Sequence, residues 1–304
     1  MTTTDAQLDA MLKRLNLANA RHLWSALAQR AEKEQWSYRD FLVTLAQEEI
    51  AKRQQTRIQH QVRHAGFPFL KTIDDFDFTF QSTLRLQMLG SALAPDFVTE
   101  GRCLILHGKT GRGKTHLAVA IAYRAIQNGF EARCITAAAL IDDLSRASRD
   151  GRLREALTAY LHPHVLVVDE VGYLAYGDDA ANVLFHVVNE RHLRRRSMVF
   201  TTNKRTRDWG RVLHDEDLAA AIVDRVLERG RLLKLDGPSM RTRHVDDQEL
   251  DDPPPPPAPS AQPARISGTD RPEFPEPAAL AAAARRPCSL GARLASTRTR
   301  HRGW

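Results

Sequence analysis

Short apolar runs alternate with amphipathic segments over the middle of the chain, and this pattern predicts an α/β protein. Continuous runs of Val, Ile and Leu are typical of strands that are buried on both faces of a parallel sheet. Apolar residues three and four positions apart are typical of helices. The predicted strands cover 103–108, 131–137, 164–170, 197–203 and 231–235, and the predicted helices cover 115–129, 140–160, 179–193 and 218–229. We therefore expect a parallel sheet that is covered by helices.

The first 64 residues show only the helical pattern. Apolar residues recur at helical spacing from residue 5 to residue 64, and Ser37 precedes an acidic first turn as an N-cap does. Gly66 and Pro68 then end the helical region. Its last part carries a basic face, for which a solvated surface and a contact with DNA or an acidic partner both remain open. The residues of this face are Lys52, Arg53, Arg57, His60, Arg63 and His64.

The composition changes sharply at residue 251. Eleven of the fifteen prolines follow this point, and large apolar residues become rare. Such a segment buries too little apolar surface to offset the entropy lost on ordering, so we expect disorder. The sequence therefore predicts a helical N-terminal domain (1–66), an α/β domain (67–250) and a disordered tail rich in Pro, Ala and Arg (251–304).

Charge and cysteine content narrow the classes of function. The chain has 304 residues, 44 basic and 37 acidic, and a formal charge of +7, which permits an anionic partner. Three widely spaced cysteines, Cys103, Cys134 and Cys288, exclude a disulfide framework and a zinc site built from cysteines. No segment approaches the roughly 20 apolar residues that span a bilayer. We expect a cytoplasmic protein that is neither secreted nor inserted in a membrane.

A phosphate-binding loop lies between the first predicted strand and the first helix of the α/β domain. Residues 108–115 match G-x-x-x-x-G-K-[ST], in which the glycines allow the backbone N–H groups to approach phosphates. Lys114 supplies a positive charge to the phosphates of ATP, and Thr115 supplies a hydroxyl ligand for Mg²⁺. The residues expected to contact ATP are Gly108, Lys109, Thr110, Gly111, Arg112, Gly113, Lys114, Thr115 and His116.

Polar residues at the ends of later strands supply candidate chemistry for hydrolysis. Asp169 and Glu170 end one strand, and strand alternation points them in different directions. We expect Asp169 to complete the Mg²⁺ site with Thr115, and Glu170 to orient and deprotonate the attacking water. Asn203 ends the next strand, where it could contact the γ-phosphate or merely terminate the strand.

Arg225 and a run of three arginines indicate function less specifically than the residues above. Arg225 lies on a helix beyond the predicted core, where a solvated or ion-paired arginine is common and a guanidinium delivered to a neighbouring subunit is the alternative. Arg194, Arg195 and Arg196 end the helix 179–193, where cations complement the helix dipole. Direct contact of these three arginines with phosphates is the alternative.

Four blocks of the sequence carry a resemblance to a known family: GKTGRGKTHLAVAIAYRA, VLVVDEVGYL, LFHVVNERHLRRRSMVFTTNKRTRDWG and LAAAIVDRV. Together they resemble the IstB-like ATPases, the helper proteins encoded beside the transposases of certain bacterial insertion sequences. This family is in turn similar to the DnaC-type helicase loaders among the AAA+ ATPases. The resemblance covers about residues 5–245. It implies an AAA+ core, a sensor role for Asn203 and a trans-acting arginine finger at Arg225. Arg241 is a weak further match, because Met240 replaces an aromatic residue, and Lys109 and Arg112 make the loop more cationic than usual in this family.

The resemblance implies that ATP-bound subunits assemble into a ring or filament on double-stranded DNA without reading its sequence, and recruit or stimulate a transposase. One alternative is a DnaC-like loader of a replicative helicase. A second is an adaptor that binds ATP as a switch and hardly hydrolyses it. A small-molecule kinase is a third, although no segment of the sequence resembles an acceptor-binding lid.

Overall fold

Five parallel strands run through the middle of the protein, in a computed structural model that describes residues 3–81, 83–173, 176–177 and 179–240. All the pairings between neighbouring strands are parallel, so the predicted parallel sheet is confirmed. The predicted tail, 251–304, and Arg241 lie outside the described residues. The strands are β1 (Cys103–His107), β2 (Ala132–Thr136), β3 (Val165–Val171), β4 (Ser197–Thr202) and β5 (Gly230–Lys234), in the order β2-β3-β4-β1-β5.

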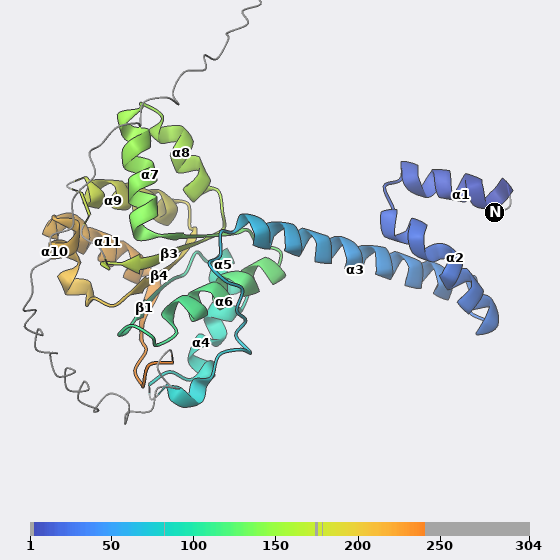
Figure 1. Ribbon diagram of the computed structural model, residues 1–304, viewed down its shortest axis with the longest axis horizontal. Helices are drawn as coiled ribbons and strands as arrows, with labels where there is room; N and C mark the ends of the chain where they lie inside the picture. Colours follow the sequence, from blue (N-terminus) through green and yellow to red (C-terminus); the bar gives the residue numbers. More distant parts are fainter. Residues whose placement is uncertain (1–2, 82, 174–175, 178, 241–304) are drawn as a thin grey trace, which may run out of the picture. The chain divides into compact units, whose positions relative to one another are not determined.

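Both faces of the sheet are buried, because successive residues of each strand point to opposite sides and most of them are apolar. In β1, Leu104 and Leu106 join one hydrophobic cluster, whereas Cys103 and Ile105 join the other. Helix α6 (Lys114–Gln127) covers the first face of the sheet. A larger group of helices covers the opposite face (Figure 1). These are α7 (Ala137–Arg149), α8 (Leu153–Leu161), α9 (Ala180–Leu193), α10 (Trp209–Leu213) and α11 (Glu216–Glu228).

The segment 140–160, predicted as one helical stretch, forms two helices. Helix α7 ends at Arg149 and α8 begins at Leu153. Between them Gly151 has φ +72°, a left-handed conformation that glycine adopts readily and other residues rarely do. The helical spacing of apolar residues continues on both sides of this glycine, which is why the pattern alone did not reveal the break.

The predicted N-terminal helices are α1 (Thr3–Arg14), α2 (Ala18–Lys33) and α3 (Tyr38–His64). Ser37 caps α3 as predicted, since its Oγ accepts a hydrogen bond of 3.2 Å from the Asp40 N–H. Glu49 of α3 is buried and accepts a 2.8 Å hydrogen bond from the Ala20 N–H. A carboxylate is favourable there because the first N–H groups of α2 have no acceptors within the helix.

The segment between α3 and β1 contains helices that the sequence pattern did not predict. They are the 3-10 helix η1 (Phe78–Phe80), α4 (Leu86–Leu93) and α5 (Asp96–Thr99). Elsewhere in the chain, between β4 and α10, lies a second 3-10 helix, η2 (Thr206–Asp208). Leu84, Leu89 and Phe97 of this segment are buried in the same cluster as α6. Packing against the sheet therefore orders a segment that is too short and irregular to show a clear period.

Candidate functional site

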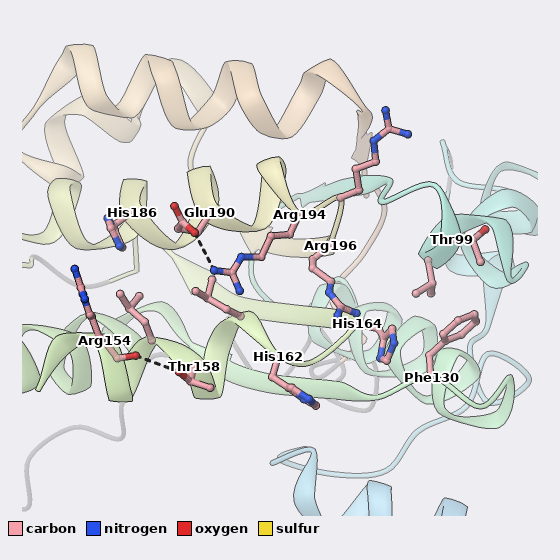
Figure 2. Close-up of a pocket in the computed structure, with 14 residues that line it drawn as sticks. Thr99, Phe130, Arg154, Thr158, His162, His164, His186, Glu190, Arg194 and Arg196 are labelled. Carbon is pink, nitrogen blue, oxygen red and sulfur yellow. Dashed lines mark hydrogen bonds and ion pairs between the residues drawn. The ribbon is translucent and has the colours of Figure 1, made fainter.

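Two cavities lie at opposite edges of the sheet, and only one contains residues predicted to bind ATP. The larger, about 930 Å³, opens where β2, β3 and β4 begin (Figure 2), and none of the predicted ATP-binding residues lines it. The smaller, about 240 Å³, opens where strands end and is lined by residues 110–116 together with Glu170 and Asn203. Ligands of open parallel sheets bind beyond the carboxyl ends of the strands. The smaller cavity is therefore the candidate site.

The predicted phosphate loop forms the turn from β1 into α6. Gly111 has φ +80°, and Gly113, the N-cap of α6, has φ +79°. A Cβ atom at Gly111 would overlap Ser239 Oγ, and one at Gly113 would overlap the Phe76 ring. Both positions thus require glycine for backbone conformation and for space. The first N–H groups of α6 lack acceptors within the helix, so the loop presents donors and the positive end of the helix dipole to the cavity.

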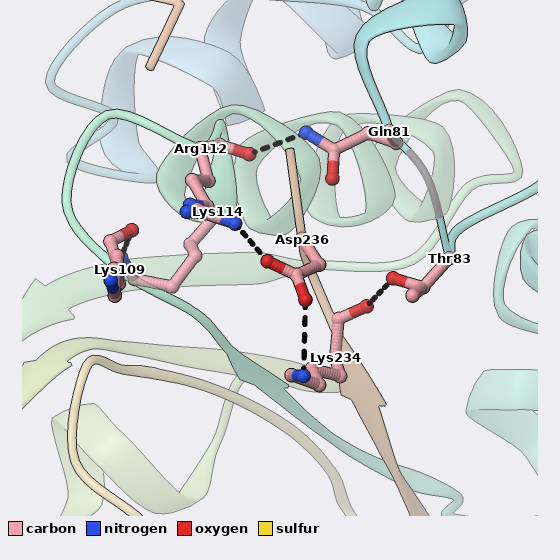
Figure 3. Close-up of polar contacts among 7 residues, drawn as sticks. All are labelled: Gln81, Thr83, Lys109, Arg112, Lys114, Lys234 and Asp236. Atoms are coloured by element: carbon pink, nitrogen blue, oxygen red, sulfur yellow. Dashed lines mark hydrogen bonds and ion pairs between the residues drawn. The ribbon is translucent and has the colours of Figure 1, made fainter. Parts of the chain in front are cut away.

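Contacts from Gln81, from β5 and from the segment after β5 hold the outside of the loop (Figure 3). Asp236 forms one ion pair with Arg112 and another, of 3.1 Å, with Lys234 Nζ. Gln81 Nε2 donates to the Arg112 carbonyl at 3.2 Å. Hydrogen bonds from Lys234 and Arg112 hold the pKa of Asp236 below its usual value. Because Arg112 is paired with a carboxylate, it adds less positive charge to the cavity than its position in the sequence suggested.

Lys114 and His116, two further basic side chains of the loop and helix start, each contact a backbone carbonyl. Lys114 Nζ donates to the Lys109 carbonyl at 2.9 Å, so its ammonium group stays at the loop. His116 Nε2 lies 2.8 Å from the Thr72 carbonyl, and its ring meets the Phe76 ring edge-on at 5.1 Å between centroids. The segment 72–76 therefore sets the orientation of the imidazole at the cavity wall.

Thr115 lines the cavity and contacts Asp169, which lies beside it. Thr115 Oγ1 lies 3.1 Å and 3.0 Å from the two carboxylate oxygens of Asp169, which is 5% exposed. A hydroxyl and a carboxylate at the end of a phosphate loop are hard oxygen donors, which Mg²⁺ prefers together with phosphate oxygens. The residues present therefore fit the predicted ion.

Glu170 is exposed to the cavity, unlike the buried Asp169 beside it. Its backbone has φ +60°, and the pairing of β3 with β4 is irregular at this point. Two hydroxyl groups hold the conformation: Thr201 Oγ1 accepts from the Glu170 N–H at 2.9 Å, and Tyr176 Oη donates to the Glu170 carbonyl at 3.3 Å. A left-handed conformation at a residue other than glycine costs free energy and persists only where its surroundings fix it.

Asn203 follows β4 and lines the same cavity. Its Oδ1 atom is buried and has no hydrogen-bond partner among the described residues. Buried polar atoms are nearly always paired, so an unpaired acceptor on a cavity wall fits a position that contacts a ligand.

Arg225 does not reach this cavity within one chain. Its Nε donates to Asn189 Oδ1 of α9 at 2.9 Å, and its guanidinium lies 4.7 Å from the centroid of the Phe185 ring. The other predicted positions lie at the loop, where the Gly108 N–H donates to the Thr202 carbonyl at 3.1 Å. The structure thus brings the predicted residues 110–116, Glu170 and Asn203 to one cavity, with Asp169 in contact with Thr115. Gly108 and Lys109 lie in the turn that precedes these residues, and Arg225 lies on α11.

Sequence reasoning missed the residues that position the site. Thr201 is fully buried and its hydroxyl also donates to Asp169, so it joins the two acidic residues. A polar residue at the end of an apolar strand was the available signal. Phe69 and Met240 line the cavity from distant parts of the chain, and no local pattern could have placed them there.

No helix within the described ranges is both long and apolar enough to cross a bilayer. The two cysteines that the structure describes, Cys103 and Cys134, are free and buried. Burial, together with the nearby Asp169, raises the pKa of Cys134 to about 12.

Comparisons with known proteins agree with the geometry. The ATP-binding protein of insertion sequence IS5376 from Geobacillus stearothermophilus is 36% identical over 236 residues, 78% of this chain and 94% of that protein. The insertion sequence IS21 protein of Pseudomonas aeruginosa, also named as ATP-binding, is 32% identical over 237 residues, 78% of this chain and 89% of that protein.

Among solved structures, the DnaC helicase loader aligns with a TM-score of 0.42 and 24% identity over 49% of this chain and 85% of that one. The DnaI structure aligns with a TM-score of 0.46 and 22% identity, over 55% of this chain and 91% of that one. The family model for the IstB-like ATP binding protein matches residues 10–248. With this match over most of its length, the chain belongs to the IstB-like family of ATP-binding proteins.

Proposed function

We propose that this protein hydrolyses ATP to ADP and phosphate and acts as a helper in transposition, assembling with ATP on double-stranded DNA and recruiting or stimulating a partner transposase. The observation that carries the proposal is the meeting of the phosphate loop, the Thr115–Asp169 pair and the exposed Glu170 at one edge of the sheet. The names of the two insertion-sequence relatives support the link to transposition.

In this proposal the loop binds the phosphates of ATP. Its N–H groups and the positive end of α6 contact the phosphate oxygens, and Lys114 moves its hydrogen bond from the Lys109 carbonyl to the β- and γ-phosphates. Thr115 and Asp169 would hold Mg²⁺, which when bound neutralises negative charge on the phosphate oxygens.

Glu170 acts as the general base. It accepts a proton from a water molecule as the water oxygen bonds to the γ-phosphorus and the bond from that phosphorus to the bridging oxygen of ADP breaks. The contacts from Thr201 and Tyr176 hold the backbone of Glu170, which keeps the carboxylate in the cavity. Asn203 uses its unpaired amide oxygen to orient the attacking water beside the γ-phosphate.

Arg225 serves the site of a neighbouring subunit. Its guanidinium lies on α11, away from the cavity of its own chain, and is held by Asn189 and Phe185. A guanidinium supplied in trans stabilises the charge that develops on the transferred phosphoryl group. Hydrolysis therefore requires assembly, which makes DNA binding and turnover parts of one cycle.

The division of labour along the chain follows the expected boundaries. We assign partner binding to residues 1–66, and ATP hydrolysis and assembly to 67–250. Free, buried cysteines suit a reducing compartment, so we place the protein in the cytoplasm.

The test measures phosphate release by the full chain with and without duplex DNA, while light scattering records the size of the protein on that DNA. We expect DNA to stimulate turnover and ATP to produce multimers. Glu170→Gln should lose about 100-fold or more of the turnover and still form multimers, because removal of a general base blocks the chemical step alone. Glu32→Gln, an exposed residue of α2, is the matched control.

ATP binding by a constant monomer with no response to DNA would contradict the proposal. Equal phosphate release by the wild type and Glu170→Gln would remove Glu170 from the mechanism. Binding and assembly without turnover in either protein would identify an adaptor that uses ATP as a switch.

A further inference from the structure

The larger cavity lies at the edge of the sheet opposite the candidate ATP site, and most of the charged residues that line it are arginines (Figure 2). Arg154 comes from α8, while Arg194, Arg195 and Arg196 come from the turn between α9 and β4. Glu190 is the single acidic residue among the described residues that line it, so four arginines and one glutamate give a formal charge of +3. Figure 2 shows Arg154 on the α8 side of the cavity and Arg194 on the α9 side, with Arg194 directed toward Glu190. The charged side chains that line this cavity are therefore mostly of one sign.

Carboxylates neutralise little of this charge. Glu190 pairs with Arg194 at 3.2 Å. Within the described part of the chain, no carboxylate forms an ion pair with Arg154, Arg195 or Arg196. Arg154 and Arg195 are exposed and Arg196 is half-buried. These three guanidinium groups are accessible to an anion from solvent.

Helix capping accounts for only part of the arginine cluster. Arg194 is the C-cap of α9, where a cation complements the helix dipole. The next residue, Arg195, has φ +51°, a conformation that glycine usually supplies after a helix. Arginine at that position costs free energy in the fold, and the geometry of the turn gives no reason for its charge.

A buried cation behind the cavity wall adds to the positive potential. Arg191 is fully buried, and its guanidinium donates to the carbonyls of Tyr160, Pro163, His164 and Ser197 at 2.6–3.1 Å. All four acceptors are neutral. Burial lowers the pKa of Arg191 to about 9, which leaves the side chain protonated at neutral pH. His164, one of its acceptors, presents its side chain to the cavity.

We propose that this cavity binds backbone phosphates of double-stranded DNA, at a surface separate from the ATP site. The inference rests on the proposed function and names the surface that meets the DNA. Arginine is suited to phosphate because its planar fork donates two parallel hydrogen bonds. A cavity of about 930 Å³ with cations on several sides exceeds what one phosphate needs, so consecutive phosphates of a polymer match it better than a single ion.

The test uses the full chain with ATP and measures its binding to a fluorescent duplex of about 30 base pairs, by anisotropy, at several salt concentrations. The test variant carries Arg154→Gln, Arg195→Gln and Arg196→Gln together. Each lost phosphate contact should reduce the slope of log affinity against log salt by about 0.9, or about 2.7 for three. The wild type should then lose about 40-fold more affinity than the variant between about 50 and about 200 mM salt.

Two further variants separate local from general effects. Lys13→Gln, Arg14→Gln and Lys33→Gln together remove the same charge from exposed positions of α1 and α2, and should leave the slope unchanged. Glu190→Gln releases Arg194 from its ion pair, so it should steepen the slope by about 0.9 and tighten binding at low salt. Binding of a fluorescent ATP analogue checks that each variant is folded.

The outcomes distinguish this inference from the proposed function. A wild-type chain that does not bind DNA at all would overturn both. DNA binding with equal slopes in the wild type, the cavity variant and Glu190→Gln would overturn the inference and leave the proposed function in place. Binding of tripolyphosphate, a small polyanion, is measured on the same proteins. If the cavity variant loses tripolyphosphate binding while its slope for DNA is unchanged, the cavity belongs to a small phosphorylated ligand and the inference is overturned.

Discussion

Replacing Thr201 by valine removes one hydroxyl group and almost no volume from the wall of the candidate ATP site. Thr201 is fully buried at the end of β4. Its Oγ1 donates to the Asp169 carboxylate and accepts from the Glu170 N–H at 2.9 Å. The substitution therefore releases the backbone of Glu170, which has φ +60°, without opening a cavity.

The structure sets the size of the expected effect. A hydrogen bond to an ionised group contributes about 1.5–3 kcal/mol, and a buried N–H without an acceptor costs about 1–3 kcal/mol. Thr201→Val should therefore lower the free energy of unfolding by about 3–5 kcal/mol, which lowers the Tm by about 10 °C in a domain of this size. Under the proposed mechanism, a displaced Glu170 carboxylate lowers kcat about 10- to 100-fold. The KM for ATP should change less than kcat, because the phosphate loop is untouched and Thr115 still donates to Asp169.

The assay is phosphate release at a temperature well below the Tm of every variant, with chemical unfolding measured in parallel. Thr201→Ser keeps the hydroxyl and should recover most of the turnover. Ser197→Ala, at the other end of β4, removes a buried hydroxyl that donates to the Phe97 carbonyl at 2.8 Å. It should lower stability by about 1–2 kcal/mol without lowering kcat. If Thr201→Val turned over ATP as fast as Ser197→Ala, the positioning role of Thr201 would be wrong.

Two further predictions concern stability. Burial, and then the nearby Arg196, hold the pKa of His164 below its ordinary value of 6.5. Below about pH 6.5 the unfolded chain binds a proton there that the folded chain does not, so stability should be full above that pH and decline below it. Thermal unfolding from about pH 8 to about pH 5 should show a shallower decline in His164→Gln than in the wild type, and parallel curves would contradict this. Trp209 is fully buried against Phe200 at 6.0 Å between ring centroids. Trp209→Ala should cost about 3–5 kcal/mol in urea unfolding and Trp209→Phe less than half of that; equal losses would show that cavity size does not determine the cost.

The sheet could be predicted from sequence because each strand is apolar on both faces. Residues such as Leu166 and Val167 both lie inside the protein, on opposite sides of β3, and this produces the continuous run that marks a buried parallel strand. Helices α4 and α5 could not be predicted in the same way. Their order depends on contacts such as that of Phe97 with the cluster around α6, which join residues far apart in the chain.

The chemistry of the site could be predicted where one short motif carries it, and not where separate segments meet. The loop glycines and Asp169 follow from fixed spacing after a strand. Arg112 and Asp236 form an ion pair although they lie 124 residues apart in the chain. The sequence therefore showed the positive charge of Arg112 but not the carboxylate that neutralises it. The left-handed backbone of Glu170 depends likewise on Thr201 and Tyr176, whose hydroxyl groups reach it from β4 and from beyond β3.

Strand direction explains why the two cavities lie apart. Since all the strands are parallel, every turn that follows a strand falls at one edge of the sheet, and every turn that precedes a strand falls at the other. Strand β4 spans both: it begins at Ser197, next to Arg196, and ends at Thr202, next to Asn203. At about 3.3 Å per residue, its six residues separate the arginine cavity from the ATP site by about 20 Å. Under the two proposals, DNA and ATP therefore do not compete for the same arginines. Strand β4, which runs from Ser197 to Thr202, is the shortest covalent connection between the two sites.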